Sequence, residues 1–354
     1  MRSITRAGRR PIALAAGLLL VAFSAAPALA CGGLIGPNGA VNLLRTTTFA
    51  GYHDGVEHYV TAFQFAGGGG KFGSLTPLPG VPTSVEKGGD WTLQRLIRET
   101  DPPAPDAFLR AAALPAASAE VLMQVKIDAL DLTVLKGGAE EVGTWATDHG
   151  FRLPPDAPEV LDFYAQRSPI FLAAAFDGDA AKARGQNIGD GTPVHISIPT
   201  DNPWVPLRIL ALGKTASEIV QADVYMLTDE SPAMLPYPDG ANGMTLQHSA
   251  PATDQLLSDL RSDRGMDWVP EAGWLTKIGI DAEAPQLGYD LAVDVSGANA
   301  PSRVAAGLEM PDATDPAVMA SIRWFAGASV VGLGIGAVIW LVAKHQIDSR
   351  LNPA

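Results

Sequence analysis

Cysteine is almost absent from this sequence: Cys31 is the one cysteine among 354 residues. An intramolecular disulfide is therefore excluded, and so is a metal site that needs several thiolates. Basic residues are also scarce, with 25 Lys and Arg against 38 Asp and Glu. The resulting net charge of −13 argues against a nucleic-acid partner, because contacts to a phosphate backbone require Lys and Arg.

Motifs that bring catalytic residues together along the chain are missing too. There is no Gly-x-Ser-x-Gly nucleophile turn and no His-Glu-x-x-His helix. A glycine run that ends in Lys71 resembles a phosphate-binding loop, but Phe65 and Phe72 stand where that loop needs Gly and then Ser or Thr. The histidines of the central region are scattered: His53, His58, His149, His195 and His248. We therefore predict no cofactor and no metal ion, and leave open a catalytic triad assembled in space.

The overall composition is that of a folded protein with many turns. Apolar residues make up 47% of the chain and charged residues 18%, which excludes a disordered protein. The 37 Gly and 28 Pro predict frequent turns and argue against an all-helical bundle.

Residues 1–30 have the pattern of an export signal. Four arginines precede an apolar stretch over residues 11–23, and Ala28-Leu29-Ala30 forms a small-x-small cleavage pattern directly before Cys31. Three alternatives stay open: an uncleaved membrane helix, a twin-arginine signal built on Arg9-Arg10, and lipidation of Cys31. With either a cleaved signal or an uncleaved helix, the central region is predicted to lie outside the cytoplasm.

The C-terminal region contains a predicted transmembrane helix over residues 324–343. These twenty residues carry no charge and match the thickness of a bilayer core. Lys344 and Arg350 follow them, whereas Asp312 and Asp315 precede them, so the positive-inside rule predicts a cytoplasmic C-terminus. We expect a single-pass protein of the cell membrane with its main domain extracytoplasmic. That exported part, residues 31–322, holds 18 Lys and Arg against 37 Asp and Glu.

The predicted transmembrane helix also carries a stripe of small residues. Ala328, Gly332 and Gly336 are spaced four apart, so they share one helix face. Such a face lets two membrane helices pack closely. The stripe predicts self-association or a protein partner within the bilayer, with Gly334 on another face.

The predicted organisation has five parts. They are a signal peptide over 1–30, an extracytoplasmic region of one or two domains over 31–295, a stalk over 296–315, a helix over 316–345 that includes the span, and a cytoplasmic tail over 346–354. Strands, then helices, then strands again favour an α+β fold with a mainly antiparallel sheet and a few helices.

Local patterns predict the individual elements of the central region. Strands are expected at 40–49, 56–65, 75–78, 121–135, 170–176, 194–198, 205–212, 219–227 and 287–295. Helices are expected after Asp90 as N-cap, around Trp145 with a stop at Gly150, after a capping box of Asp156 and Glu159, and over 253–261.

Several short motifs occur in an order that is similar to a known family. They are Cys31-Gly32-Gly33 after the signal, the strand from Tyr59 to Phe65, Thr76-Pro77-Leu78-Pro79, Trp145 with His149-Gly150-Phe151, the strand over 170–176, and the run from Pro203 to Arg208. Together they resemble exported bacterial proteins of the domain of unknown function 2330 family over residues 31–235. The resemblance implies location and domain extent, and it brings no reaction, substrate or catalytic residue.

Two functions are compatible with these observations. The first is a non-enzymatic, membrane-anchored domain that binds or scaffolds a partner at the bacterial cell surface. The alternative is an enzyme or metal-binding protein that uses Cys31, because cleavage after Ala30 would leave a thiol beside a free amine, and the pair can act as base and nucleophile or chelate a soft metal.

Overall fold

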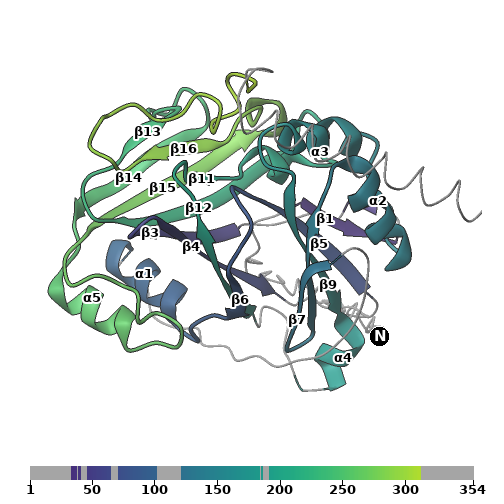
Figure 1. The fold of residues 1–354 in the computed structure, drawn as a ribbon, viewed down its shortest axis with the longest axis horizontal. Helices are drawn as coiled ribbons and strands as arrows, with labels where there is room; N and C mark the ends of the chain where they lie inside the picture. The colour runs from purple at the N-terminus through teal and green to yellow at the C-terminus, as the bar shows by residue number, and fades with distance from the viewer. Residues whose placement is uncertain are drawn as a thin grey trace, which may run out of the picture.

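The fold is that of a computed structural model, which describes residues 33–37, 39–40, 46–64, 71–101, 121–183, 185 and 191–311. Cys31, the predicted signal peptide and the predicted span with Ala328, Gly332 and Gly336 lie outside these residues. Two large sheets and one small sheet form most of the described chain, and short helices cover their outer faces (Figure 1). The predicted α+β class is confirmed in its sheet-dominated form.

The larger sheet has seven strands in the order β14-β15-β12-β3-β4-β10-β6. Its strands are β14 (Met244–Pro251), β15 (Trp274–Glu283), β12 (Ile219–Thr228), β3 (Thr46–His53), β4 (Val56–Gln64), β10 (Gly191–Pro199) and β6 (Ser84–Lys87). All neighbours are antiparallel except β3 and β12, which are parallel. The sheet therefore joins strands from both ends of the described chain.

The second sheet has six strands in the order β2-β1-β5-β9-β8-β7 and is antiparallel throughout. Its strands are β1 (Gly33–Gly36), β2 (Gly39–Ala40), β5 (Lys71–Leu78), β7 (Val121–Ile127), β8 (Leu130–Lys136) and β9 (Ile170–Asp177). A short sheet of β11 (Trp204–Val205), β16 (Leu291–Asp294) and β13 (Ala233–Leu235) completes the strands.

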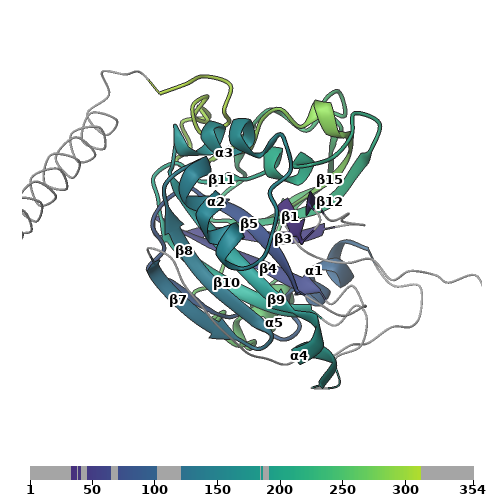
Figure 2. The ribbon, with the colours of Figure 1, turned by 90° about the vertical axis from the view of Figure 1, so that its right-hand side faces the viewer.

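The helices occupy two separate regions (Figures 1 and 2). Helices α1 (Thr92–Thr100) and α5 (Asp254–Arg261) lie side by side against the seven-stranded sheet, while α2 (Ala139–Asp148) and α3 (Ala157–Ala165) lie near the six-stranded sheet. The remaining helical elements are α4 (Gly178–Ala183) and the 3-10 turns η1 (Arg208–Ala211) and η2 (Ala284–Gln286).

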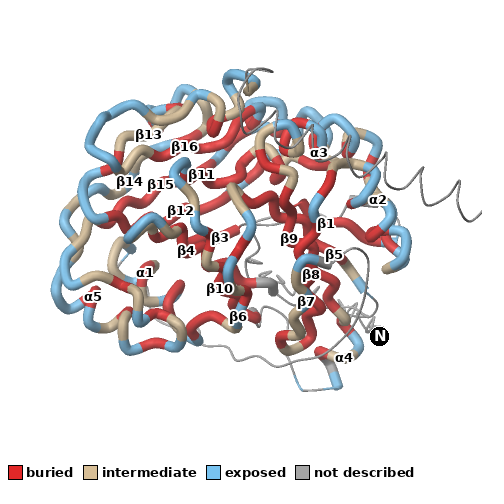
Figure 3. The backbone as a smooth tube through the Cα atoms, in the orientation of Figure 1, coloured by how far each residue is buried: buried red, intermediate tan, exposed pale blue. Residues whose placement is uncertain are grey.

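Buried residues form two hydrophobic clusters, one on each face of the seven-stranded sheet (Figure 3). The larger cluster includes Leu75, Trp145 and Phe171 together with inward-facing residues of the seven-stranded sheet such as Ile196. The smaller cluster lies beneath α1 and α5 and includes Phe49, Leu96 and Leu257. Both faces of the central strands are therefore covered, so polar side chains on either face are buried.

Several predicted elements are corrected by the structure. The single strand expected at 121–135 is a hairpin, because Asp128 adopts a positive φ of 59° between β7 and β8. The strand expected at 205–212 ends at Val205, and η1 follows. The last strand is shorter than expected and spans Leu291–Asp294. Strands β14 and β15 are present where no strand was predicted.

At two helices, the side chain predicted to cap the N-terminus does not make the capping hydrogen bond. Helix α1 has Trp91 at its N-cap, and its first backbone amides bond to Asp263 rather than to Asp90. Helix α3 does follow Asp156, but this side chain makes no cap bond and accepts instead from the Gly213 amide at 2.9 Å. In contrast, the helix expected over 253–261 is confirmed as α5, and Thr253 Oγ1 caps it by accepting from the Leu256 amide at 3.2 Å.

The described part of the predicted stalk contacts the rest of the fold. Ala305 and Ala306 are buried, and the carbonyl of Ala305 accepts a bond from Arg167 at 2.6 Å. Among the described helices, none has the length and apolar character of a bilayer-spanning segment.

Candidate functional site

The β3–β4 hairpin places a carboxyl and a phenol side by side at one end of the seven-stranded sheet. Asp54 and Gly55 both have positive φ, as a two-residue hairpin turn requires. This turn fixes the register so that Tyr52 lies directly opposite Glu57. Directly paired residues share a face, so both side chains point toward the small sheet above them.

Glu57 is the most unusual residue of this hairpin. It is 1% exposed, and neither carboxyl oxygen has a hydrogen-bond partner of ordinary geometry among the described residues. Burial raises the pKa of Glu57 to about 8, and the approaching backbone N–H of Trp204 opposes this rise only in part. The carboxyl is therefore mostly protonated at neutral pH.

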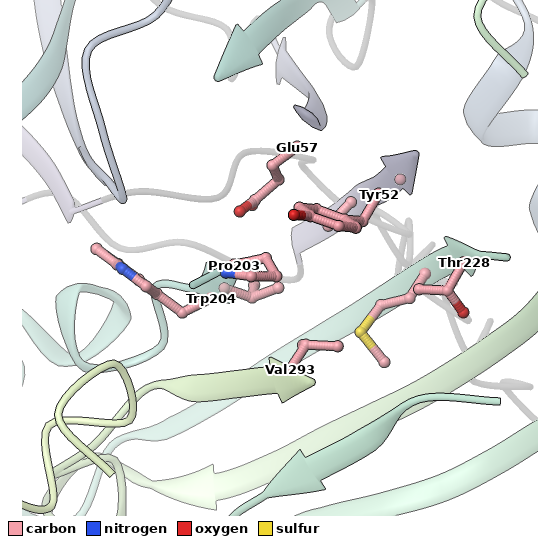
Figure 4. Close-up of a pocket in the computed structure, with 10 residues that line it drawn as sticks. Tyr52, Glu57, Pro203, Trp204, Thr228 and Val293 are labelled. Carbon is pink, nitrogen blue, oxygen red and sulfur yellow. The ribbon is translucent and has the colours of Figure 1, made fainter. Parts of the chain in front are cut away.

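A small cavity lies against Glu57 (Figure 4). Its volume is about 10 Å³, close to the minimum of about 10–15 Å³ that holds one water molecule. The residues around it come from β3, β4, β11, β12 and β16: Ala50, Gly51, Tyr52, Glu57, Pro203, Trp204, Val205, Met226, Thr228 and Val293. Apart from Tyr52, which is partly exposed, all of these residues are buried, so the cavity meets solvent beside the Tyr52 ring.

Acidic residues surround the Tyr52 ring where it meets solvent. The pKa of Tyr52 is raised, first by burial and then by the negative charges of Asp201, Glu57 and Asp229. The Tyr52 hydroxyl donates to the Thr200 carbonyl at 2.8 Å, which holds the ring beside the 200–203 loop. We call Tyr52, Asp201 and Asp229 the acidic mouth of the Glu57 cavity.

His53 is a basic group that contacts this mouth. Its Nδ1 lies 2.7 Å from Asp229 Oδ1, and its Nε2 lies 3.6 Å from Asp54 Oδ2. Asp54 and Asp229 are exposed, whereas the side chain of His53 is 29% exposed. The pair therefore stays accessible to solvent and to a competing cation.

The opposite face of the same strands carries a buried stack of three rings. His58 Nδ1 and His195 Nε2 are 3.0 Å apart, so one ring nitrogen donates and the other accepts. The Trp268 ring lies over His58, with centroids 3.9 Å apart and planes 4° from parallel. Gly51 makes room for it, because a Cβ at that position would come within 2.0 Å of the Trp268 ring.

Both histidines of this stack are held in the neutral form. Burial lowers the pKa of His58 to about 3, with smaller contributions from His195 and His53. Burial also lowers the pKa of His195 to about 4. Two neutral imidazoles that bond to each other and pack against an indole ring form a structural element. Among the described residues there is no group of three His, Cys, Asp or Glu able to hold a metal ion.

A third polar cluster is structural. Asp290 is fully buried and accepts from the Tyr164 hydroxyl, the Leu207 amide and the Arg167 guanidinium, at 2.8, 2.7 and 2.5 Å. Arg167 in turn stacks on Phe163, Tyr164 and Trp204. This network joins α3, η1 and the start of β16, and it fixes the position of Trp204 at the cavity.

The residues highlighted in the sequence are dispersed in the structure. His53 is near the acidic mouth, His58 and His195 meet on the other face, and His149 stacks on Trp145 with centroids 4.5 Å apart. His248 lies on the edge strand β14. Glu57 was not singled out, because a charged residue in an alternating strand normally indicates the solvent face.

Comparisons with known proteins identify a family. The model of the family described as "Uncharacterized protein conserved in bacteria (DUF2330)" matches residues 25–234, more than half of the chain. The chain belongs to this family. The DUF2330 match includes Glu57, His58 and His195, whereas Trp268 and Asp290 lie beyond its end.

Other comparisons add little to the DUF2330 assignment. A search of curated proteins gave no match. Two solved structures of baculovirus P35, one of them a mutated form after caspase cleavage, match at 9% identity with TM-scores of 0.37 and 0.36. The matches cover 70% of this chain and 96% and 98% of the P35 chains, and similarity this low carries no argument about fold or function.

Proposed function

We propose that this DUF2330 member is a membrane-anchored binding protein whose folded body lies outside the cytoplasm. One observation carries the proposal: every strand and helix that the structure describes, from Gly33 to Asp294, falls between the two apolar end segments. A signal before the body and a charge-free segment after it would export the body and then hold it at the membrane.

Binding is favoured over catalysis by the state of the buried polar groups. Glu57 and the two histidines of the stack are enclosed, and the cavity beside Glu57 is about the size of one water molecule. A reaction needs room for a substrate next to its catalytic groups. The acidic body, with 37 Asp and Glu against 18 Lys and Arg over residues 31–322, favours a basic partner.

The topology is tested with reporter fusions. A reporter that is active only outside the cytoplasm should be active when fused after Gly297 and inactive when fused after Ala354. The reverse pattern, or activity at neither position, would overturn the proposed location. Gly297 suits the first fusion because it lies in an exposed loop beyond β16.

The alternative function depends on Cys31 and is tested separately. Strand β1 begins two residues after Cys31, and a Cβ on Gly33 would meet Leu212 at 2.6 Å, so the first described residue packs against the body. Cys31→Ser should leave partner binding intact if the body binds the partner, and should abolish function if the thiol is the reactive group. The intact mass of the mature protein distinguishes signal cleavage, lipidation and a bound metal.

The proposal extends to the membrane segment. The stripe of Ala328, Gly332 and Gly336 would pack against a second helix in the bilayer. Gly332→Ile and Gly336→Ile should each weaken association in a crosslinking assay, and Gly334→Ile is the matched control. Equal effects of all three substitutions would leave the segment as a plain anchor.

A further inference from the structure

We propose that the Glu57 cavity and its acidic mouth bind one primary ammonium group, carried by a lysine side chain or by a small aliphatic amine. This inference rests on the proposed binding function and names the chemical class that the function would recognise. Four observations carry it: a buried carboxyl without a hydrogen-bond partner of ordinary geometry, a space of matching size, the aromatic ring of Tyr52 beside that space, and acidic residues around that ring.

The first observation is the carboxyl itself. Burying a polar group without a hydrogen-bond partner costs free energy, and Glu57 has both carboxyl oxygens in that condition among the described residues. A ligand that donates hydrogen bonds to these oxygens recovers this cost. If it also carries a positive charge, it pairs with the carboxylate and makes the stronger, charge-assisted kind of bond.

The size and the lining of the cavity select the ligand further. A space of about 10 Å³ accepts a group no larger than a water molecule, which an ammonium head matches and a guanidinium or a quaternary ammonium exceeds. The Tyr52 ring borders this space, whereas the Trp204 ring extends away from it and stacks on Tyr164 and Arg167 (Figure 4). The Tyr52 face attracts a cation, and the methylene stem that follows the charge would lie outside this small space, along the partly exposed Tyr52 ring.

The entrance has the matching charge. Asp201 and Asp229 act on Tyr52, the one partly exposed residue of the lining, so the negative potential there attracts a cation to the cavity. His53 lies on the same side, and its Nδ1 is 2.7 Å from Asp229 Oδ1. Tyr52, His53, Asp201 and Asp229 are therefore the titratable groups that accompany Glu57 in any pH dependence.

Ammonium binding requires Glu57 to lose its proton. The ligand is already charged at neutral pH, so the pair forms when the carboxyl proton is released to solvent. Affinity should therefore increase as pH rises from 6 toward 8.5, and binding should release a proton.

The experiment uses the full chain purified in detergent and titrated with n-butylammonium chloride. Isothermal titration calorimetry in two buffers of different ionisation enthalpy measures affinity and proton release together. Three probes serve as controls: n-butanol has the same shape without charge, tetramethylammonium has charge without N–H donors, and potassium chloride matches the ionic strength. We expect saturable binding of n-butylammonium alone, with proton release at pH 7.

Two variants assign the binding to the site. Glu57→Gln keeps the size of the side chain and removes the charge, and should weaken n-butylammonium binding by about tenfold or more, as expected for loss of a charge-assisted bond. Glu86→Gln is the matched control, because Glu86 is an exposed glutamate on β6 of the same sheet. Nα-acetyl-lysine amide then distinguishes the sources: tighter binding than n-butylammonium indicates a lysine side chain, and weaker binding indicates a free amine.

Three results would overturn the proposal. They are equal binding of n-butylammonium and n-butanol, unchanged affinity in Glu57→Gln, and binding without proton release at pH 7. The last result does not depend on any variant and so holds even if Glu57→Gln folds poorly. The reporter fusions test the location independently, so a failure of ammonium binding with the expected topology would reject this site and keep the membrane-anchored binding function.

Discussion

At the scale of single residues, strand β4 places two ionisable side chains in succession on opposite faces of one sheet. Glu57 points toward the small sheet, and His58 points toward α5 and the loop that carries Trp268. Burial removes the charge from both, but in opposite senses, because the carboxyl gains a proton and the imidazole loses one. The two residues therefore make opposite contributions to the pH dependence of stability.

The Glu57 contribution can be isolated above pH 6.5. Its pKa of about 8 exceeds the unfolded value of 4.5, so the native state retains a proton that the unfolded state has released. The free energy of unfolding should therefore fall as pH rises through this window, by at most about 1.4 kcal/mol per pH unit. Urea unfolding at pH 6.5 and 8 measures it, and Glu57→Gln should remove most of the decline. The same decline in the variant would assign it to another group.

The histidine contribution belongs to acid pH. The pKa values of His58 and His195, about 3 and 4, are below the unfolded value of 6.5, so the unfolded state binds protons that the native state excludes. Each histidine should destabilise the protein by at most about 1.4 kcal/mol per pH unit on acidification below pH 6.5. His58→Asn should reduce this loss between pH 6.5 and 5, as measured by urea unfolding. His248→Asn on edge strand β14 is the control, and an equal reduction there would contradict the assignment.

At the scale of elements, helix α1 depends on a residue far away in the sequence. Asp263 accepts from the amides of Asp90 and Trp91 at 3.0 Å each and from Thr92 Oγ1 at 2.8 Å. The Trp91 amide is one of the groups that a helix N-terminus leaves without an internal partner, because Trp91 is the N-cap of α1. A carboxylate also suits the positive end of the helix dipole. The loop after α5 thus supplies the cap that holds α1 against the sheet.

The cap predicts unequal effects for two aspartates at the same helix end. Asp263→Ala should lower the free energy of unfolding by about 1–3 kcal/mol, because it leaves buried donors unpaired. Asp90→Ala should change it little, since Asp90 is exposed and its contact with Arg264 is 3.3 Å long at the surface. Chemical denaturation of both variants is the measurement, and equal losses would argue against the cap.

Elements whose signals lie in their own residues could be predicted from the sequence, whereas elements shaped by distant contacts could not. Strands β4, β9, β10 and β12 and helices α2 and α5 were expected, because their apolar pattern or their stop signals lie within the element itself. The run over 205–212 is apolar enough for a strand, but Asp290 binds the amides of Leu207 and Arg208 and turns the chain into η1. No local pattern reveals a partner 83 residues away.

Strand β15 was missed for a related reason. Lys277 and Asp281 interrupt its apolar pattern, but Lys277 is 3% exposed and reaches the exposed Asp101, so a charged residue of the sequence is buried in the fold. Glu57 was overlooked in the same way. The sheet is covered on both faces, and alternation in a single strand cannot show that its polar side will also be buried.

At the scale of the whole molecule, the fold is larger than the family match. DUF2330 ends at Met234, yet β15 pairs with β12 along ten residues, from Ile219 opposite Glu283 to Thr228 opposite Trp274. Helix α5, Trp268 and Asp290 also lie beyond the match and complete the smaller cluster, the ring stack and the polar network. The C-terminal third of the described chain is therefore part of the same sheet.

A truncation tests this dependence. A chain that ends after Met234 should lack protease resistance and a cooperative unfolding transition, because β12 would lose its partner β15 and α1 would lose α5. A chain that ends after Pro311 keeps all described elements and serves as the control. Limited proteolysis and circular dichroism compare them. A stable fold in the shorter chain would show that β15 is an addition to a complete domain.

The parallel pairing of β3 with β12 has a consequence for the order in which the chain can fold as it is made. The β3–β4 hairpin forms from neighbouring residues, but one side of β3 stays without its partner until β12 has emerged, as the 176-residue separation of His53 and Asp229 illustrates. Sheets closed by such distant strands assemble slowly, and an open strand edge can pair with other chains in the meantime. If the chain is exported in an extended state, as proposed above, this delay would keep the seven-stranded sheet open until β12 has crossed the membrane.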